Sequence, residues 1–206
     1  MKISKIAILF LSICLFTGQA SAQYVQPERD DTIRMYPKAV FDTSSAKTAL
    51  ALGKATIKGV AFTRPTDQGF GIKTGKKIYA NKITITLFPV TPYLTEYLAL
   101  KKKENYKKLK FAYVTPAFFH YRLTAVTNSA GEFTFPQMKP GRYYLTGSLP
   151  WYQTGTYNKY TGSGYGSYGG RVDYYENRPY RNDYSEPLEK FVEIKSDGEV
   201  LEVRLK

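Results

Sequence analysis

The chain has almost none of the residues that metal sites and activated nucleophiles need. In 206 residues there is one cysteine, Cys14, and one histidine, His120. A zinc site of ordinary type needs several Cys or His ligands, and a calcium loop needs a dense run of acidic side chains. The sequence offers neither pattern, so we expect no metal and no cofactor.

The single histidine also limits what an active site could contain. A Ser-His-acid triad could be drawn only through His120, and no Gly-x-Ser-x-Gly turn accompanies a serine. His120 lies in a strand-like pattern beside Phe118, Phe119 and Tyr121, which is typical of a structural or surface residue. The sequence therefore predicts a protein that is not an enzyme.

Long hydrophobic runs are missing apart from residues 6–16, which are too few to span a bilayer. Lys2 and Lys5 precede this run, and Ala20-Ser21-Ala22 follows it as a small-residue cleavage site. This is the pattern of a bacterial signal peptide, residues 1–22, cleaved after Ala22. A lipoprotein anchor at Cys14 is the alternative, but isoleucine precedes it where a small residue is needed. We expect a periplasmic or secreted protein.

The processed chain has no cysteine, so its stability must come from packing rather than disulfides. The full chain carries a net charge of +13. A basic surface is either simply solvated or attracts an anionic partner, such as lipopolysaccharide, acidic polysaccharide or an acidic protein. Export argues against nucleic acid as that partner.

What the sequence does contain is strand patterning, most clearly in residues 127–145. Turn residues occupy 128–131, and Phe133 and Phe135 then alternate with Thr134. Pro140-Gly141 marks a second turn, after which Tyr143 and Leu145 resume the alternation. Further strands are predicted at 55–64, with a β-bulge near Gly59, and at 82–88, 118–127, 142–149, 191–195 and 200–205. Asp197-Gly198 indicates a hairpin joining the last two.

These patterns define the predicted organisation after the signal peptide. Residues 23–49 form an N-terminal arm or linker, and residues 50–206 form one β domain. Within it, 91–117 is predicted to be a helical insert, with Thr91 as cap and Pro92 in the first turn. Its basic C-terminal half is a solvated helix end or an anion or membrane-surface contact. The lysines of this half are Lys101, Lys102, Lys103, Lys107, Lys108 and Lys110.

The second unusual segment is 151–184, which holds the only tryptophan and nine of the 19 tyrosines. Its glycines disfavour a core strand, so we predict a long Tyr/Gly-rich loop, with an extra edge hairpin as an alternative. Tyrosine offers a large rigid surface with a polar tip, which suits a contact surface for protein or for sugar rings. The candidate partner-binding residues are Trp151, Tyr152, Tyr157, Tyr160, Tyr165 and Tyr168.

Several of these pieces together resemble the carboxypeptidase regulatory-like domain, of the prealbumin-like (transthyretin-like) group. The strongest is Gly131-Glu132-Phe133-Thr134-Phe135 followed by Pro140-Gly141-Arg142-Tyr143-Tyr144-Leu145, and Lys58-Gly59-Val60, 75–87 and 191–205 add to it. The resemblance implies a mainly β, Greek-key prealbumin-like sandwich of about seven strands. It also implies a structural or binding role. The ring-cleaving hydrolases of that group use several histidines, which this chain lacks.

Three functions follow from these observations. The leading one is an exported, non-enzymatic binding or scaffolding component of a bacterial envelope assembly. The alternative is a small module that binds anionic glycan or lipopolysaccharide through aromatic and lysine side chains. The third, an enzyme with an unrecognised site, has no paired nucleophile and base to support it.

Overall fold

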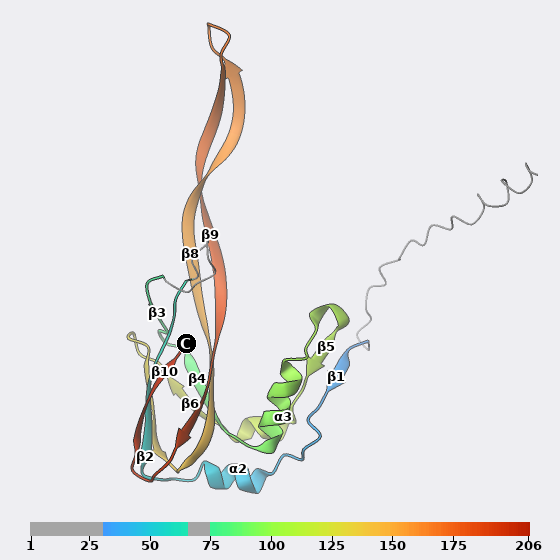
Figure 1. Cartoon of the computed structure of the whole chain (residues 1–206), viewed down its shortest axis with the longest axis vertical. Helices are drawn as coiled ribbons and strands as arrows, with labels where there is room; N and C mark the ends of the chain where they lie inside the picture. Colours follow the sequence, from blue (N-terminus) through green and yellow to red (C-terminus); the bar gives the residue numbers. More distant parts are fainter. Residues whose placement is uncertain (1–30, 66–74) are drawn as a thin grey trace, which may run out of the picture.

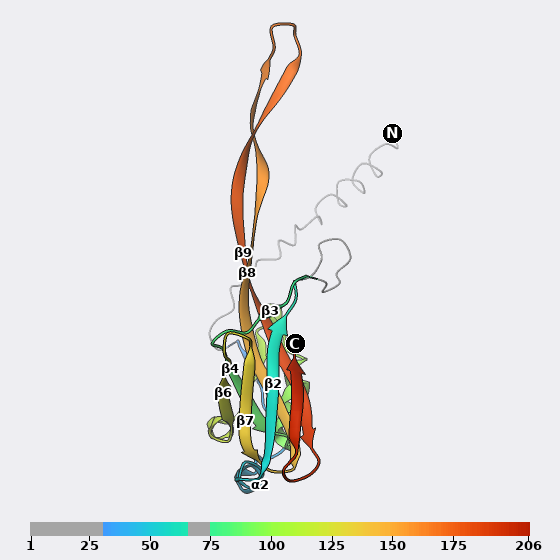
Figure 2. The ribbon, with the colours of Figure 1, turned by 90° about the vertical axis from the view of Figure 1, so that its left-hand side faces the viewer.

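The computed structural model describes residues 31–65 and 75–206; the signal peptide predicted at 1–22 lies outside the described residues. Two β-sheets pack face to face, and one long hairpin rises far beyond them (Figures 1 and 2). A helix and short 3-10 turns lie beside one sheet. The predicted mainly β sandwich with one inserted helix is therefore confirmed.

The first sheet is built around β2 (Ala55–Thr63). This strand runs parallel to β10 (Val200–Leu205) and antiparallel to β7 (Glu132–Met138) and to the two-residue β3 (Ile78–Tyr79). The first and last strands of the sandwich are thus direct neighbours, so this sheet is complete only when both ends of the domain are present.

The second sheet has the antiparallel order β6-β4-β8-β9. Its strands are β6 (Leu123–Val126), β4 (Thr84–Pro89), β8 (Gly141–Tyr165) and β9 (Arg171–Ile194). The remaining elements are β1 (Ile33–Met35), α2 (Thr43–Ala49), α3 (Pro92–Lys101), η1 (Tyr106–Lys108), β5 (Lys110–Ala112) and η2 (Pro116–His120).

The core lies between the two sheets and follows the period-two patterning of the sequence. Ile57 and Phe135 from one sheet meet Ile85, Leu87 and Leu145 from the other, all of them buried. Every second residue of a strand faces the same side, so alternating apolar residues supply one continuous core. Burial of this apolar surface is the main stabilising term of a domain that has no disulfide.

The motif at 127–145 is folded as predicted. The Asn128 carboxamide oxygen accepts hydrogen bonds from the backbone N–H of Ala130 and Glu132, at 3.0 and 2.9 Å. Gly131 has φ +76°, and a Cβ there would overlap the backbone of Ala61, so the turn requires glycine. The Tyr143 hydroxyl then lies 3.0 and 2.8 Å from the backbone carbonyl oxygens of Ala49 and Lys139, which share its single proton.

A second, aromatic cluster covers the outer face of the β6-β4-β8-β9 sheet. Helix α3 begins as predicted, with the Thr91 hydroxyl accepting from Leu94 N–H at 3.2 Å. Tyr93 and Leu94 of this helix pack with Phe88, Tyr144, Phe118 and Phe41. Residues 31–49 therefore dock on the domain: Phe41 joins this cluster, and β1 pairs with β5.

Four local predictions were wrong. The 91–117 insert is helical only to Lys101 and then contains η1, β5 and η2. The strand predicted at 118–127 begins at Leu123, so His120 ends η2 instead. The bulge lies where β2 shifts register against β7 between Ala55 and Ile57; Gly59 stays in register and leaves room for the Phe133 ring.

The fourth error concerns the predicted hairpin at 191–205. Asp197-Gly198 does form a turn, with φ +83° at Gly198, but it carries the chain from one sheet to the other. Both flanking strands bury side chains in the same core, Ile194 from one side and Leu205 from the other, so they face each other across it. The Asp197 carboxylate accepts from Lys54 N–H at 2.9 Å and holds the turn at the start of β2.

Candidate binding arm

The segment predicted to be a loop is a regular β-hairpin that leaves the sandwich. Strands β8 and β9 pair continuously from Gly141–Ile194 to Tyr165–Arg171. The last buried residues are Leu149 and Leu188, and everything beyond them is exposed or half-buried. We call residues 150–185 the arm. At about 3.3 Å per residue it extends roughly 50 Å from the sandwich (Figures 1 and 2).

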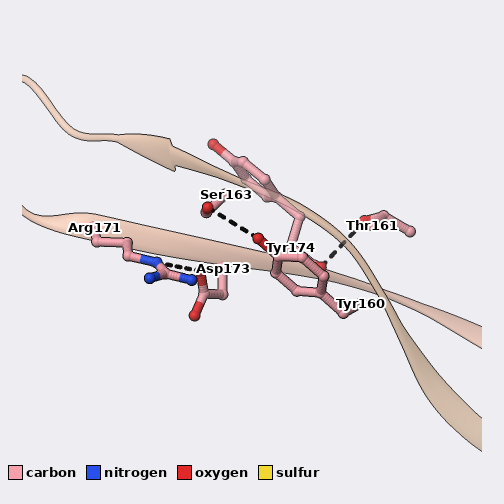
Figure 3. A network of polar contacts seen from close by, with 6 residues as sticks. All are labelled: Tyr160, Thr161, Ser163, Arg171, Asp173 and Tyr174. Carbon is pink, nitrogen blue, oxygen red and sulfur yellow. Dashed lines mark hydrogen bonds and ion pairs between the residues drawn. The ribbon is translucent and has the colours of Figure 1, made fainter. Parts of the chain in front are cut away.

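The outer half of the arm has its own polar contacts (Figure 3). The register shifts between Tyr160 and Gly162, and the Thr161 hydroxyl donates to the Tyr174 carbonyl at 3.1 Å across this bulge. The Tyr160 hydroxyl donates to Ser163 Oγ at 2.9 Å. At the end, Gly166 N–H donates to Gly170 O at 2.8 Å and closes the turn. Such contacts fix the bulge and tip in one conformation, although no core lies beneath them.

The six candidate partner-binding residues all lie on β8 or in the tip, but on different faces. Successive residues of a strand point to opposite sides. Trp151 and Tyr157 therefore share one face, whereas Tyr152 and Tyr160 share the other. The bulge at 161 shifts this alternation, which places Tyr165 with the second pair, and Tyr168 lies in the tip turn. The arm thus offers two aromatic faces rather than one.

The two rings closest to the sandwich each contact a neighbouring side chain, although Tyr152 is still 58% exposed. Trp151 stacks on Tyr184 with ring centroids 4.4 Å apart, and its Nε1 is buried with no hydrogen-bond partner in the part of the chain that the structure describes. The Arg181 guanidinium lies 4.2 Å above the Tyr152 ring. The most accessible candidates are Tyr165, which is 82% exposed, and Tyr168, which is fully exposed.

The structure adds binding candidates that the sequence reasoning did not single out. Four tyrosines lie on β9: Tyr174, Tyr175, Tyr180 and Tyr184. Tyr175 is paired with Tyr160 and packs edge-on against it, whereas the other three are paired with Gly162, Gly155 and Trp151 of β8. Only the hairpin register identifies them as part of the same surface. The signal that could have found them is the high tyrosine content on both sides of the glycine-rich tip.

The charges of the arm neutralise one another along β9. Residues 151–184 hold four basic and three acidic side chains. Three ion pairs join residues two apart on this strand: Arg171–Asp173 at 2.8 Å, Arg178–Glu176 at 2.8 Å and Arg181–Asp183 at 2.9 Å. Each pair is exposed and contributes little to stability. The arm is therefore an aromatic surface close to neutral, unlike the chain as a whole.

The candidate anion-contact lysines do not lie on one helix. Lys101 is the last residue of α3 and its Nζ lies 3.4 Å from a Glu189 carboxylate oxygen. Lys102 and Lys103 follow the helix end, Lys107 and Lys108 lie on η1, and Lys110 begins β5. The other five lysines form no ion pair with Glu189 and lie close together in sequence. They belong to different elements, so no single helix face presents them.

An apolar groove of about 800 Å³ separates the end of α3 from β9, lined by Leu98, Lys102, Tyr144 and Phe191 among others. The Tyr144 hydroxyl is buried near this groove without a hydrogen-bond partner among the described residues. Burial, reinforced by the negative charge of Glu189, raises the pKa of the Tyr144 phenol far above its ordinary value. This phenol stays neutral at physiological pH, so it is not a candidate base.

Metal and catalytic chemistry find no further support. Among residues 31–65 and 75–206 no group of three His, Cys, Asp or Glu side chains could hold a metal ion. His120 is exposed at the end of η2. No helix in this described part is long and apolar enough to cross a membrane.

Comparison with known proteins supports the fold alone. No family model matches the chain, and no curated protein matches it. Among solved structures, the chain is similar to a Pseudomonas aeruginosa protein whose name proposes carbohydrate binding. The two share 18% sequence identity with a TM-score of 0.52, and the match covers 80% of this chain and 96% of the other.

Proposed function

We propose that this protein is an exported, non-enzymatic β-sandwich that binds a component of the bacterial envelope through its arm. The observation that carries the proposal is the arm itself, which displays aromatic side chains on both faces and adds nothing to the core. Large exposed aromatic surfaces on soluble domains are typical of interaction sites. The signal-peptide pattern at 1–22 supports export.

The same proposal places the chain with carboxypeptidase regulatory-like domains. The support is the folded motif at 127–145, in which Gly131 makes the turn and Phe133, Phe135, Tyr143 and Leu145 enter the core. Such modules are commonly binding or structural units. Fold alone does not determine function, so the arm carries the functional argument.

Glycan binding is the second candidate. Exposed tyrosine rings such as Tyr165 and Tyr168 suit stacking against sugar rings. The name of the Pseudomonas aeruginosa neighbour points the same way. The exposed lysines at 102, 103, 107 and 108 would add attraction for an acidic polysaccharide, lipopolysaccharide or a membrane surface.

Truncating the arm tests the proposal. Residues 154–181 are replaced by Asn-Gly, a two-residue turn that joins the paired Gln153 and Asn182. The intact and truncated proteins are crosslinked in envelopes, and the captured partners are identified by mass spectrometry. We expect the intact chain to capture a defined component that the truncated chain loses. Equal capture by both would exclude the arm as the binding site.

A lysine variant tests whether the lysines or the rings of the arm carry the binding; a glycan held by the rings would behave like a protein partner here. Lys102, Lys103, Lys107 and Lys108 are changed to Gln, which leaves the arm intact. Binding to the aromatic arm should survive this change and also 0.5 M salt. Retention on acidic polysaccharide should be lost in both conditions, because screening at high salt removes attraction between exposed charges.

A further inference from the structure

Strand β9 presents an open edge along the whole arm. It is the last strand of its sheet, and in the described part of the chain it pairs only with β8. A long exposed strand edge carries unpaired N–H and C=O groups and is a template for another strand. Proteins usually protect such edges with charged side chains, especially lysine, with proline, or by keeping the strand short. This edge carries both signs of charge in a particular order.

The order of charge along β9 is antisymmetric about Asn177. Counting outward from Asn177, Glu176 is matched by Arg178, Asp173 by Arg181, and Arg171 by Asp183. Every charged residue between 171 and 183 therefore has a residue of opposite sign at the same distance on the other side. When such a strand pairs antiparallel with a copy of itself about Asn177, all six charges face an opposite charge.

We propose that the β9 edge of the arm pairs antiparallel with the β9 edge of a second copy of this chain, about a two-fold axis at Asn177. The proposed function does not depend on this pairing, because it uses the aromatic faces of the arm rather than its edge. Facing residues of antiparallel strands share one face and interact directly, so opposite charges stabilise the pair. A two-fold interface is self-complementary by symmetry.

The uncharged residues fit the same register. Tyr174 of one copy faces Tyr180 of the other, which gives two aromatic pairs per dimer. Pro179, which faces Tyr175, is the exception: it has no N–H, so the Tyr175 carbonyl opposite receives no backbone donor and the new ladder lacks two hydrogen bonds per dimer there. Asn177 faces its own copy, and its carboxamide supplies both donor and acceptor.

The backbone is also in phase with this register. Gly166 and Gly170 are joined by a hydrogen bond at the tip, and bonded and unbonded pairs alternate along an antiparallel ladder. The odd-numbered residues of β9 in the arm then turn their C=O groups to the open edge, and all of them except Pro179 also turn an N–H group to it. A two-fold axis at Asn177 pairs odd residues with odd residues, as a new ladder on that edge requires.

The length of the arm matches the proposed pairing. Asn177 lies close to the middle of the β9 part of the arm, which runs from Arg171 to residue 185. In the dimer, residue 185 of one copy faces residue 169 of the other, so each tip ends where the other sandwich begins. The two sandwiches lie at opposite ends, roughly 50 Å apart at about 3.3 Å per residue.

This arrangement keeps the positive charges of the two copies apart. The chain carries +13, but the seven charged residues of 151–184 leave that segment with only one excess positive charge. The arms can therefore approach without strong repulsion. The basic sandwiches are separated by far more than the Debye length of about 10 Å at 0.1 M salt. The β8 edge offers no such match, since Lys159 is its single charged residue in the arm.

A charge-swap experiment tests the pairing. An acidic variant carries Arg171→Asp and Arg181→Asp, and a basic variant carries Asp173→Arg and Asp183→Arg. Sedimentation velocity at micromolar to 100 μM protein gives the association state. We expect the wild type to dimerise and each variant alone to associate at least about tenfold more weakly, because like charges then face each other. An equimolar mixture of the two variants should restore the dimer, which also shows that both are folded.

A disulfide experiment tests the register, with a matched control. In a Cys14→Ser background, Asn177→Cys places one thiol on the two-fold axis, where facing Cα atoms are about 5.5 Å apart. The control is Asn158→Cys, the residue paired with Asn177 but on β8. Mild oxidation should crosslink the first variant into a covalent dimer at least tenfold faster than the second.

The outcomes are decisive in both directions. A wild type that stays monomeric up to 100 μM overturns the proposal, whatever the arm binds. A dimer that both charge variants retain unchanged assigns the contact to another surface and also overturns it. Crosslinking at Asn158→Cys as fast as at Asn177→Cys excludes the β9 edge. Dimer loss in the variants, rescue on mixing and selective crosslinking together establish it.

Discussion

Removing the outer arm is expected to leave the sandwich at least as stable as before. The variant lacks residues 154–181 and joins Gln153 to Asn182 through Asn-Gly, so the Trp151–Tyr184 stack at the base remains. None of the removed side chains is buried, and the core residues all lie outside the deleted range. No packing contact of the sandwich is lost, which removes the usual cause of destabilisation.

The size of the effect follows from loop closure. Each doubling of a flexible connection costs about 0.6 kcal/mol, so cutting this one by almost four doublings stabilises the fold by up to about 2 kcal/mol. That figure is an upper limit, since the arm's own ladder offsets part of the closure entropy. We therefore expect the free energy of unfolding to change by between zero and about +2 kcal/mol.

Urea unfolding measures this directly. Far-UV circular dichroism follows the sheets, and fluorescence of Trp151, the only tryptophan, follows the base of the arm. Both signals should give one coincident transition in the truncated chain. A loss of more than about 2 kcal/mol would mean that the arm supports the sandwich, and the description of the arm as a separate binding element would then be wrong.

Four further substitutions test the sandwich. Tyr143→Phe removes the proton that two backbone carbonyls share and should cost about 1–2 kcal/mol, whereas Tyr144→Phe, whose hydroxyl has no hydrogen-bond partner among the described residues, should be neutral or stabilising. Burial raises the pKa of both phenols, so their neutral forms stabilise the fold below about pH 10 and stability falls as pH rises through the folded pKa values; each Tyr→Phe change should flatten that alkaline loss in pH-dependent unfolding. Gly59→Ala places a methyl group against the buried Phe133 ring and should cost about 1–3 kcal/mol in urea unfolding. Thr91→Ala removes the cap of α3 and should cost about 1 kcal/mol by the same assay.

The sandwich was predictable because its strands have one buried face. Ile85 and Leu87 alternate with polar residues, as do Phe133 and Phe135. This alternation indicates a strand with one face in the core. Turn residues with fixed requirements, Asn128 and Gly131, added the boundaries. The pairing partner of each strand was harder to predict, since alternation specifies a buried face but not which sheet the strand joins. The misassigned hairpin at 191–205 has this cause.

The sequence predicts the hairpin of the arm only as an alternative to a loop, because neither of its faces is buried. Tyrosines such as Tyr157 and Tyr160 occupy both faces, and glycines interrupt the pattern, so no apolar period of two remains. Cross-strand pairing with β9, over residues far apart in sequence, is what orders it. The prediction of a helix through the lysine-rich stretch was wrong for a different reason. Asn105 caps a new 3-10 turn after Lys101, so the helix does not continue.

Charge and aromatic area are divided between the two parts of this protein, and that division constrains how it can bind. The basic side chains belong overwhelmingly to the sandwich and its helical layer, whereas 151–184 is nearly neutral and holds nine of the 19 tyrosines. Long-range attraction to any anionic surface therefore acts on the sandwich and weakens with salt. Short-range contact by aromatic rings acts at the arm and does not weaken with salt. A partner that needs both parts must present an anionic surface beside a site that accepts rings, and a partner that needs only one can be identified by its response to salt.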